Sequence, residues 1–274
     1  MKTSLANYTV GIIGCGTLGS LVAEGINAGQ AGPYRVKCVF DEPAPNNAKS
    51  LAGKSGASFC ASFEDFLQLK CDYVVEAANG TALKTYAVKC IEAGSSLVLL
   101  STGALADKEF YETVSRVAQE KQKKVHIPSG ALGGLDLAQA AAMGGNLSVT
   151  MATEKPPAAL LGAPALARRQ LSDDQRELVF QGTAFEAVAG FPKNVNVVAS
   201  LSLATVGLDH VKMNVYSDPS LQRNKHAFVL EGNFGRATVE IEAAPSARNP
   251  KSSALAAYSI LALLKKLASP IQLG

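Results

Sequence analysis

Three glycines near the start of the chain have the spacing of a phosphate-binding turn. Gly14, Gly16 and Gly19 form a G-x-G-x-x-G pattern between an apolar run at residues 9–13 and apolar residues at helical spacing. In such a pattern the first glycine permits a tight turn, the second lets the backbone approach a pyrophosphate, and the third allows close packing of helix on sheet. The start of the helix offers unpaired N–H groups to the phosphates. The pattern predicts a dinucleotide site at Gly14, Gly16, Thr17, Leu18 and Gly19.

An acidic residue stands where such a site needs one. Asp41 ends the next apolar run, 22 residues after Gly19, which is close to the spacing of an acid that binds the ribose 2′-hydroxyl. Because an acid there repels a 2′-phosphate and no arginine stands beside it, NAD is favoured as the cofactor and NADP stays possible. We also assign Ala77 and Ala78, at the end of a third strand-like run, to the cofactor site. The alternative is a tight turn in an α/β domain that binds another ligand.

Histidine is the side chain best suited to proton transfer near neutral pH, and the chain has three. His126 lies inside an apolar strand end, as a packed residue would, and His210 follows a predicted turn and should face solvent. His226 follows Asn224 at the start of a predicted strand, where a side chain can reach a cleft between domains. Of the three, His226 is the candidate for a catalytic role, in which it would activate the hydrolytic water as general base or hydrogen-bond the α-carboxylate of a substrate.

Other polar residues are candidates for binding a substrate. Ser129 and Gly130 follow a predicted strand, and ligands of open α/β sheets bind at the carboxyl ends of strands. Cations that could bind a carboxylate are Lys193, Arg223, Lys225 and Lys251, and for each the alternative is a solvated surface charge. The substrate residues that we predict are Ser129, Gly130, Asn224 and Lys251. Glu76 could orient a cofactor group or serve as a buried hydrogen-bond acceptor.

The elements around these residues predict two domains. Short apolar runs alternate with helical patterns up to residue 130, which is typical of a doubly wound parallel sheet, an α/β Rossmann domain over residues 1–133. Strands are then expected at residues 146–153, 184–189, 211–217, 226–231 and 236–242. The last two flank a Gly-Asn-Phe-Gly hairpin signature, so residues 134–249 should form an α+β domain with a mixed or antiparallel sheet. An amphipathic helix within residues 250–274 is expected to complete the first domain.

Composition favours a small-molecule ligand. A formal net charge of +3 in 274 residues argues against nucleic acid or an anionic membrane as partner. The apolar stretch at residues 254–264 is well short of the roughly 20 residues that span a bilayer. The five cysteines are odd in number and lack a C-x-x-C spacing, so we expect neither disulfides nor a metal site, and a reducing, cytoplasmic location.

Besides the glycine-rich turn, several longer motifs carry a resemblance to a known family. They are residues 11–19 (GIIGCGTLG), 74–78 (VVEAA), 128–136 (PSGALGGLD), 191–197 (FPKNVNV), 224–226 (NKH), 232–235 (GNFG) and 249–253 (NPKSS), together with Asp218-Pro219. Through nearly its whole length the sequence resembles the L-aspartate dehydrogenase family. Ser252 stands where threonine is usual, a change that keeps the hydroxyl.

The resemblance implies an activity and further site residues. It implies oxidative deamination of L-aspartate through iminosuccinate to oxaloacetate and ammonia, with NAD or NADP reduced. By position it implies that Ala131 and Asn196 contact the dinucleotide and that His226 is catalytic. It also implies a homodimer formed through the second domain. The alternatives are a related dehydrogenase or imine reductase acting on another small dicarboxylic or amino acid, and a weakly catalytic NAD(H)-binding sensor.

Overall fold

The computed structural model describes residues 8–192, 196–246 and 249–272, without the side chains of residues 245–246 and 249–252. The chain forms two compact units. Residues 1–130 and 254–274 make the first unit, and residues 131–253 make the second. The boundaries predicted from the sequence lie at 133/134 and 249/250.

The first unit contains a six-stranded sheet in the order β3-β2-β1-β4-β5-β6, in which every pair of neighbours is parallel. Its strands are β1 (Tyr8–Ile13), β2 (Tyr34–Phe40), β3 (Ser58–Phe59), β4 (Tyr73–Glu76), β5 (Ser96–Leu99) and β6 (Val125–His126). The central strands are buried on both faces, as their continuous apolar runs predict. The predicted Rossmann fold is confirmed.

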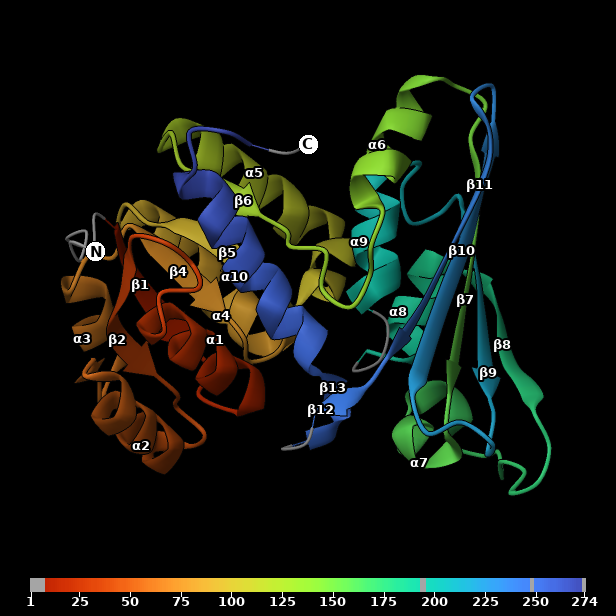
Figure 1. Cartoon of the computed structure of the whole chain (residues 1–274), viewed down its shortest axis with the longest axis horizontal. Helices are drawn as coiled ribbons and strands as arrows, with labels where there is room; N and C mark the ends of the chain where they lie inside the picture. The colour runs from red at the N-terminus through yellow and green to blue at the C-terminus, as the bar shows by residue number, and fades with distance from the viewer. Residues whose placement is uncertain (1–7, 193–195, 247–248, 273–274) are drawn as a thin grey trace. The chain divides into compact units, whose positions relative to one another are not determined.

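Helices connect these strands (Figure 1). They are α1 (Thr17–Asn27), α2 (Pro45–Ser55), α3 (Phe63–Gln68), α4 (Gly80–Glu92), the 3₁₀ helix η1 (Thr102–Ala106), α5 (Lys108–Glu120) and, from the end of the chain, α10 (Ala254–Ala268). α10 packs against α1 so closely that a Cβ atom on Gly25 would lie 2.2 Å from Leu261 Cδ1. The short elements β3 and α3 lay outside the sequence prediction.

The second unit contains a five-stranded mixed sheet in the order β11-β10-β7-β9-β8, and its β7–β9 pair is parallel. The strands are β7 (Ser148–Lys155), β8 (Glu177–Thr183), β9 (Val211–Ser217), β10 (Asn224–Gly232) and β11 (Gly235–Ala243), with a separate small pair, β12 (Pro245–Ser246) and β13 (Asn249–Ser253). The helices are α6 (Leu135–Met143), α7 (Pro157–Leu160), η2 (Pro164–Leu166), α8 (Ala184–Gly190) and α9 (Asn196–Ala204). The prediction of a mixed sheet is confirmed, and β10 and β11 form the predicted hairpin.

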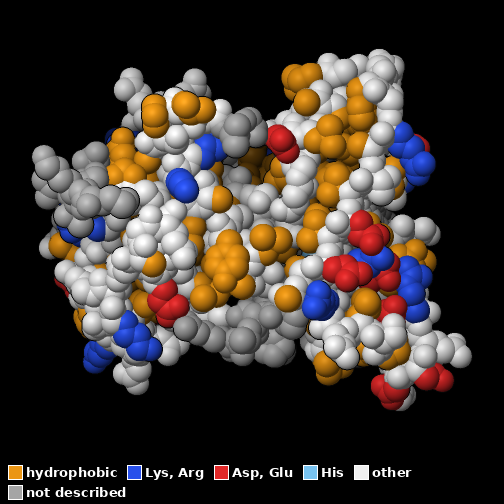
Figure 2. All heavy atoms as spheres, in the orientation of Figure 1, with side chains coloured by type: hydrophobic (Ala, Val, Ile, Leu, Met, Phe, Trp, Pro, Cys, Tyr) orange, Lys and Arg blue, Asp and Glu red, His pale blue; other side chains and the backbone are white. Residues whose placement is uncertain are grey.

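The two faces of this second sheet differ in character. Alternate residues of β7, β9 and β10 are buried beneath α6, α8 and α9, which Figure 1 shows on one side of the sheet. The opposite face carries ion pairs, among them Arg176–Glu154 at 2.8 Å and Lys225–Glu240 at 3.0 Å. Acidic and basic side chains are interspersed on the surface drawn in Figure 2. Burial in this unit is therefore one-sided.

One predicted strand is wrong. Residues 184–189, expected as a strand, belong to helix α8. Thr183 caps that helix: its side chain accepts a hydrogen bond from the Glu186 backbone N–H, and the Glu186 carboxylate accepts one from the Thr183 N–H at 2.8 Å. This capping box overrides the weak alternation of the segment. The strand of this region is β8, which the sequence analysis missed.

Candidate active site

Gly14 and Gly19 allow the turn after β1 to pack closely against the segments beside it. Gly14 has φ +92°, and a Cβ atom there would lie 2.7 Å from the backbone of Ala77 and Ala78. A Cβ atom on Gly19 would lie 1.9 Å from the carbonyl oxygen of Gly14. The turn, the start of α1 and the segment after β4 therefore meet in van der Waals contact, which side chains at these positions would prevent.

Gly16 differs from the other two glycines because it faces open space. A Cβ atom there would have no neighbour within 4 Å. Gly16 is also the N-cap of α1, and no side chain caps this helix end in the part of the chain that the structure describes. The N–H groups of the first turn, at Thr17 and Leu18, are the kind of donors that bind a phosphate. The turn thus fits a pyrophosphate.

Asp41 lies directly after β2, beside this turn. Its Oδ2 atom accepts a hydrogen bond from the Cys15 N–H at 2.7 Å, and Oδ1 accepts one from the Ala44 N–H at 3.2 Å. The carboxylate is therefore fixed at the carboxyl end of the sheet by the glycine turn. The structure brings together eight predicted cofactor residues at the ends of β1, β2 and β4: Gly14, Gly16, Thr17, Leu18, Gly19, Asp41, Ala77 and Ala78.

Glu76, the last residue of β4, is a buried acceptor. Its carboxylate accepts hydrogen bonds from the Ala78 N–H at 2.8 Å, the Ser101 N–H at 3.0 Å and the Ser101 Oγ at 2.9 Å. Burial raises the pKa of Glu76, although these hydrogen bonds oppose the shift. Of the two roles considered, the structure supports the second: Glu76 ties together the ends of β4 and β5 beside the turn.

A polar group of side chains ends the buried face of the second sheet. We call it the buried polar cluster; its members are Thr153, Lys155, Ser217, Asn224 and His226. His226 pairs with Thr153 across β10 and β7, and Lys155 pairs with Ser217 across β7 and β9. The same rows of the sheet carry apolar side chains further along, such as Met151 and Phe228. The buried polar cluster therefore lies at one end of this face, next to the apolar core of the second unit.

His226 is held in a defined orientation within this cluster. Its Nδ1 atom lies 3.0 Å from Thr153 Oγ1, and only 3% of the residue is exposed. Burial, with the nearby charge of Lys155 as a second cause, lowers the pKa of His226 to about 3. The imidazole is therefore neutral at physiological pH in the ligand-free protein, and the ring nitrogen that carries no proton can accept a hydrogen bond.

Lys155 and Thr153 were not among the residues predicted from the sequence. Both lie on β7, whose inward positions are Val149, Met151, Thr153 and Lys155. The signal was the period-two pattern of this strand, which places a lysine in the row of buried residues. A charged side chain on the inward row of a strand is a stronger indication of a site than a charged residue near a motif.

The remaining candidates are divided between the two units. Ser129 and Gly130 follow β6 in the first unit, where the Gly130 N–H donates a hydrogen bond to Ser259 Oγ at 3.1 Å. Asn224 belongs to the buried polar cluster. The others in the second unit are Ala131, at its first residue, Asn196, at the start of α9, and Lys251, in β13 with a side chain outside the described ones. Lys193 lies outside the described residues, and His210 is exposed, as predicted.

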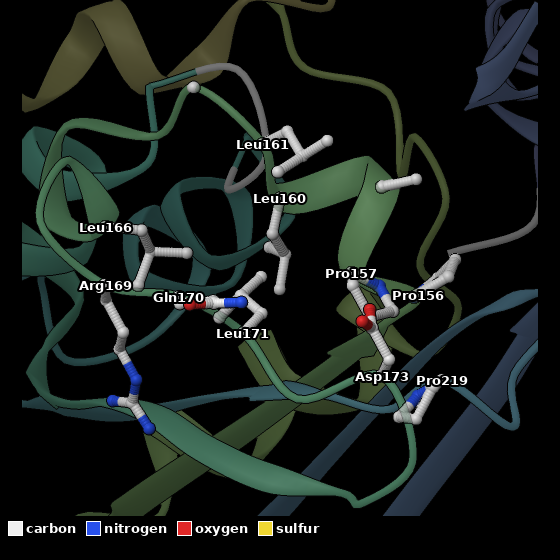
Figure 3. A pocket seen from close by; sticks show the side chains of 12 residues that line it. Pro156, Pro157, Leu160, Leu161, Leu166, Arg169, Gln170, Leu171, Asp173 and Pro219 are labelled. Carbon is white, nitrogen blue, oxygen red and sulfur yellow. The ribbon is translucent and has the colours of Figure 1, made fainter.

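A cavity of about 630 Å³ lies elsewhere in the second unit, around α7 and η2. Leu160, Leu166 and Leu171 face it in Figure 3, and it contains none of the candidate residues. Arg169 on its rim forms an ion pair with Glu177 at 2.6 Å. No group of three or more potential metal-binding side chains occurs among the residues that the structure describes. None of the described helices is long and apolar enough to cross a bilayer.

Two family models match the chain, and the C-terminal one continues into α10. The family model for the C-terminal part of aspartate dehydrogenase matches residues 136–267, and that for the NAD-binding domain of homoserine dehydrogenase matches residues 14–128. Over 270 residues the chain is 40% identical to L-aspartate dehydrogenase of Methanosarcina mazei and 38% identical to that of Methanosarcina barkeri, covering 97% of this chain and 98% of each relative. The chain belongs to the aspartate dehydrogenase family.

A solved structure of the aspartate dehydrogenase family has the same fold. The crystal structure of aspartate dehydrogenase from Thermotoga maritima matches with a TM-score of 0.73 at 27% sequence identity, covering 98% of this chain and 100% of that chain. The model for the C-terminal part of the aspartate dehydrogenase family spans the whole buried polar cluster. Both the glycine turn and this cluster therefore lie within regions that match known oxidoreductases.

Proposed function

We propose that this protein is an NAD(P)-dependent L-aspartate dehydrogenase, which converts L-aspartate through iminosuccinate to oxaloacetate and ammonia. The observation that carries the proposal is the imidazole of His226, buried at the polar end of the second sheet and fixed through Nδ1. Membership of the aspartate dehydrogenase family and the glycine turn support it.

The first unit supplies the cofactor site in this proposal. The open space at Gly16, the uncapped N-terminus of α1 and the fixed carboxylate of Asp41 fit a pyrophosphate and a ribose 2′-hydroxyl. A bound NAD(P) supplies the acceptor for the hydride that leaves the substrate α-carbon. The acid at Asp41 favours NAD over NADP. We also assign Ala131 and Asn196 to dinucleotide contacts, following their positions in the family.

His226 acts in proton transfer in the proposed reaction. The substrate amine must be neutral before its α-carbon loses hydride, and the resulting imine is then attacked by water. A neutral imidazole can accept a proton from that water as the new C–O bond forms. Ser129, Gly130, Asn224 and Lys251 are proposed to hold the substrate, although the N–H of Gly130 already donates to Ser259.

We further propose a cytoplasmic homodimer that associates through the second unit. The second sheet has helices on one face, and its other face carries paired charges that a second copy could cover. Five free cysteine thiols suit a reducing compartment. Light scattering coupled to size-exclusion chromatography tests the dimer: a monomer at micromolar concentration contradicts it.

Steady-state formation of NADH with L-aspartate, compared with a panel of amino acids and hydroxy acids, tests the function. We expect L-aspartate to give the highest kcat/KM. Replacing His226 with alanine should lower kcat at least ~100-fold, the usual scale for an acid–base residue, with NADH affinity unchanged. Turnover of another dicarboxylic or amino acid in place of aspartate would identify a related dehydrogenase, and NADH binding without any turnover would identify a sensor.

A further inference from the structure

Lys155 occupies a position where lysine is rarely found. It is the fourth inward-facing residue of β7, after Val149, Met151 and Thr153, and only 5% of it is exposed. Lysine is almost never buried to this extent without a specific reason, because an ammonium group loses its hydration on burial. If this position served only to pack the core, an apolar residue would be expected there. The presence of a charged side chain therefore indicates another role.

The neighbours of Lys155 on the sheet are polar and share its face. Lys155 pairs with Ser217 on β9, and two residues earlier Thr153 pairs with His226 on β10. Paired residues of adjacent strands project to the same side of a sheet. Lys155 therefore lies two residues along the same row from the partner of His226, and its charge is the second cause of the lowered pKa of His226.

Ser217 adds a second, independent observation. The residue is fully buried, and among the described residues its Oγ atom has no hydrogen-bond partner. Buried hydroxyl groups almost always find a partner, so one without a partner requires an explanation. An oxygen of a ligand beside Lys155 would provide it, because the hydroxyl can donate to that oxygen.

The backbone at the end of β7 is anchored by a hydrogen bond and followed by two prolines. Its carbonyl oxygen accepts a hydrogen bond from the Asp218 N–H at 2.9 Å, and Pro156 and Pro157 follow. The Asp218 carboxylate accepts hydrogen bonds from the Ser220 N–H at 2.9 Å and the Ser220 Oγ at 2.6 Å, within its own turn. The end of β7 is therefore held in place before any ligand binds, as a binding residue requires.

We propose that Lys155 is a substrate-binding residue: its ammonium group binds a carboxylate of the dicarboxylic substrate, and the Ser217 hydroxyl donates a hydrogen bond to the same carboxylate. This inference rests on the proposed function and adds to it a cation that no motif marks. An aspartate substrate has two carboxylates. A charge-assisted hydrogen bond binds a carboxylate strongly, and the attraction between the charges is greater where bulk water is excluded. Burial lowers the pKa of Lys155 to about 8, and a bound carboxylate would favour the charged form.

The test compares Lys155→Met and Ser217→Ala with the unchanged protein. KM and kcat are measured for L-aspartate, and the Kd of succinate, which lacks the amine, is measured calorimetrically on the NADH complex. For Lys155→Met we expect KM and the succinate Kd to rise ~10- to 100-fold, with kcat changed less than about 3-fold and NADH affinity unchanged. For Ser217→Ala we expect both constants to rise about 3- to 10-fold.

Lys225→Met is the matched control. Lys225 lies on β10, faces the opposite side of the sheet and pairs with Glu240, so its loss should leave all these constants unchanged. If Lys155→Met fails to fold, as judged by its melting temperature and NADH binding, Lys155→Gln and Ser217→Ala decide the question. A folded Lys155 variant that binds succinate and aspartate as the unchanged protein does would overturn the inference.

The same measurements separate this inference from the proposed function. If the unchanged protein does not oxidise L-aspartate but its succinate binding depends on Lys155, the proposed activity is wrong and Lys155 still binds a dicarboxylate. If the protein oxidises L-aspartate and Lys155→Met keeps the original KM, the activity stands and the role of Lys155 is wrong.

Discussion

His226 and Thr153 face each other across neighbouring strands, with 3.0 Å between the Nδ1 atom of the imidazole and the Oγ1 atom of the threonine. This contact occupies one ring nitrogen and leaves Nε2 as the nitrogen that can meet a ligand. When Nδ1 carries the proton and donates to Oγ1, Nε2 is the acceptor that a general base needs. Thr153 is thus a positioning residue for His226.

Replacing Thr153 with valine should therefore impair catalysis while leaving the fold intact. Valine has nearly the same shape but cannot hold the imidazole, so we expect kcat for L-aspartate to fall ~10- to 100-fold. Thr153→Ser, which keeps the hydroxyl, should stay within about 3-fold of the unchanged protein. Stopped-flow and steady-state kinetics, with NADH affinity as the control, check this. Equal kcat values for the two variants would show that the hydroxyl does not orient the ring.

The buried imidazole also predicts how stability depends on pH. The pKa of His226 is about 3 in the folded protein and 6.5 for an ordinary histidine. Between these values the unfolded chain binds a proton that the folded protein does not. Stability is therefore lost as the pH falls from 6.5 towards 3, by up to about 1.4 kcal/mol per pH unit. Above pH 6.5 the contribution is constant.

Denaturant unfolding from pH 7.5 to pH 4 measures this effect. His226→Gln should reduce the slope of the curve between pH 6.5 and 4, because the substituted side chain does not titrate there. His126, whose pKa is also lowered by burial, contributes in the same direction, so His126→Gln should reduce the slope separately and the double variant should reduce it further. Curves of equal slope for His226→Gln and the unchanged protein would show that residue 226 is accessible to water when folded.

The sequence predicted the fold well where local patterns and tertiary structure agree. The strand at residues 9–13, the glycine turn and the hairpin around residues 232–235 have strong local signals, and each occurs as predicted. The segment at residues 184–189 was misassigned because its capping box, Thr183 with Glu186, was not recognised. The two-residue strand β3 carries too little local signal, because its pairing with β2 alone defines it.

The candidate site was predictable in part. Gly14, Gly16, Gly19 and Asp41 could be found because their chemistry depends on sequence spacing. The period-two pattern of β7 places Lys155 in one row with Val149 and Met151, but the burial of that row results from the pairing of β7 with two strands distant in sequence. The hydrogen bond between Thr153 and His226 likewise joins residues 73 positions apart.

Two substitutions in the glycine turn differ in the room that the added methyl group would have. Gly19→Ala would place a Cβ atom 1.9 Å from the Gly14 carbonyl oxygen, so the turn must shift. We expect a loss of roughly 1–3 kcal/mol of stability together with weaker NADH binding. Gly16→Ala meets no atom within 4 Å, and its φ of −73° suits any residue. Its stability should change by less than about 0.5 kcal/mol, while NADH affinity falls at least ~10-fold, because the methyl group occupies the path of the pyrophosphate.

Thermal unfolding and NADH fluorescence titration distinguish these outcomes. The informative result is a Gly16→Ala protein that melts normally and binds NADH poorly, since only a ligand can explain that combination. If Gly16→Ala bound NADH as tightly as the unchanged protein, the pyrophosphate would have to lie elsewhere.

Asp41 offers a test of cofactor choice that separates charge from structure. Its carboxylate accepts hydrogen bonds from the N–H groups of Cys15 and Ala44, so removing the side chain would also disturb the glycine turn. Asn in this position keeps an acceptor oxygen for the Cys15 N–H, loses the weaker acceptor for the Ala44 N–H and loses the negative charge. For Asp41→Asn we therefore expect the preference for NAD over NADP, measured as a ratio of kcat/KM values, to fall ~10- to 100-fold, mainly because NADP is no longer repelled. Asp41→Ala should weaken binding of both cofactors, because the turn loses its anchor. A ratio that stays constant in Asp41→Asn would mean that Asp41 supports the turn and does not meet the ribose.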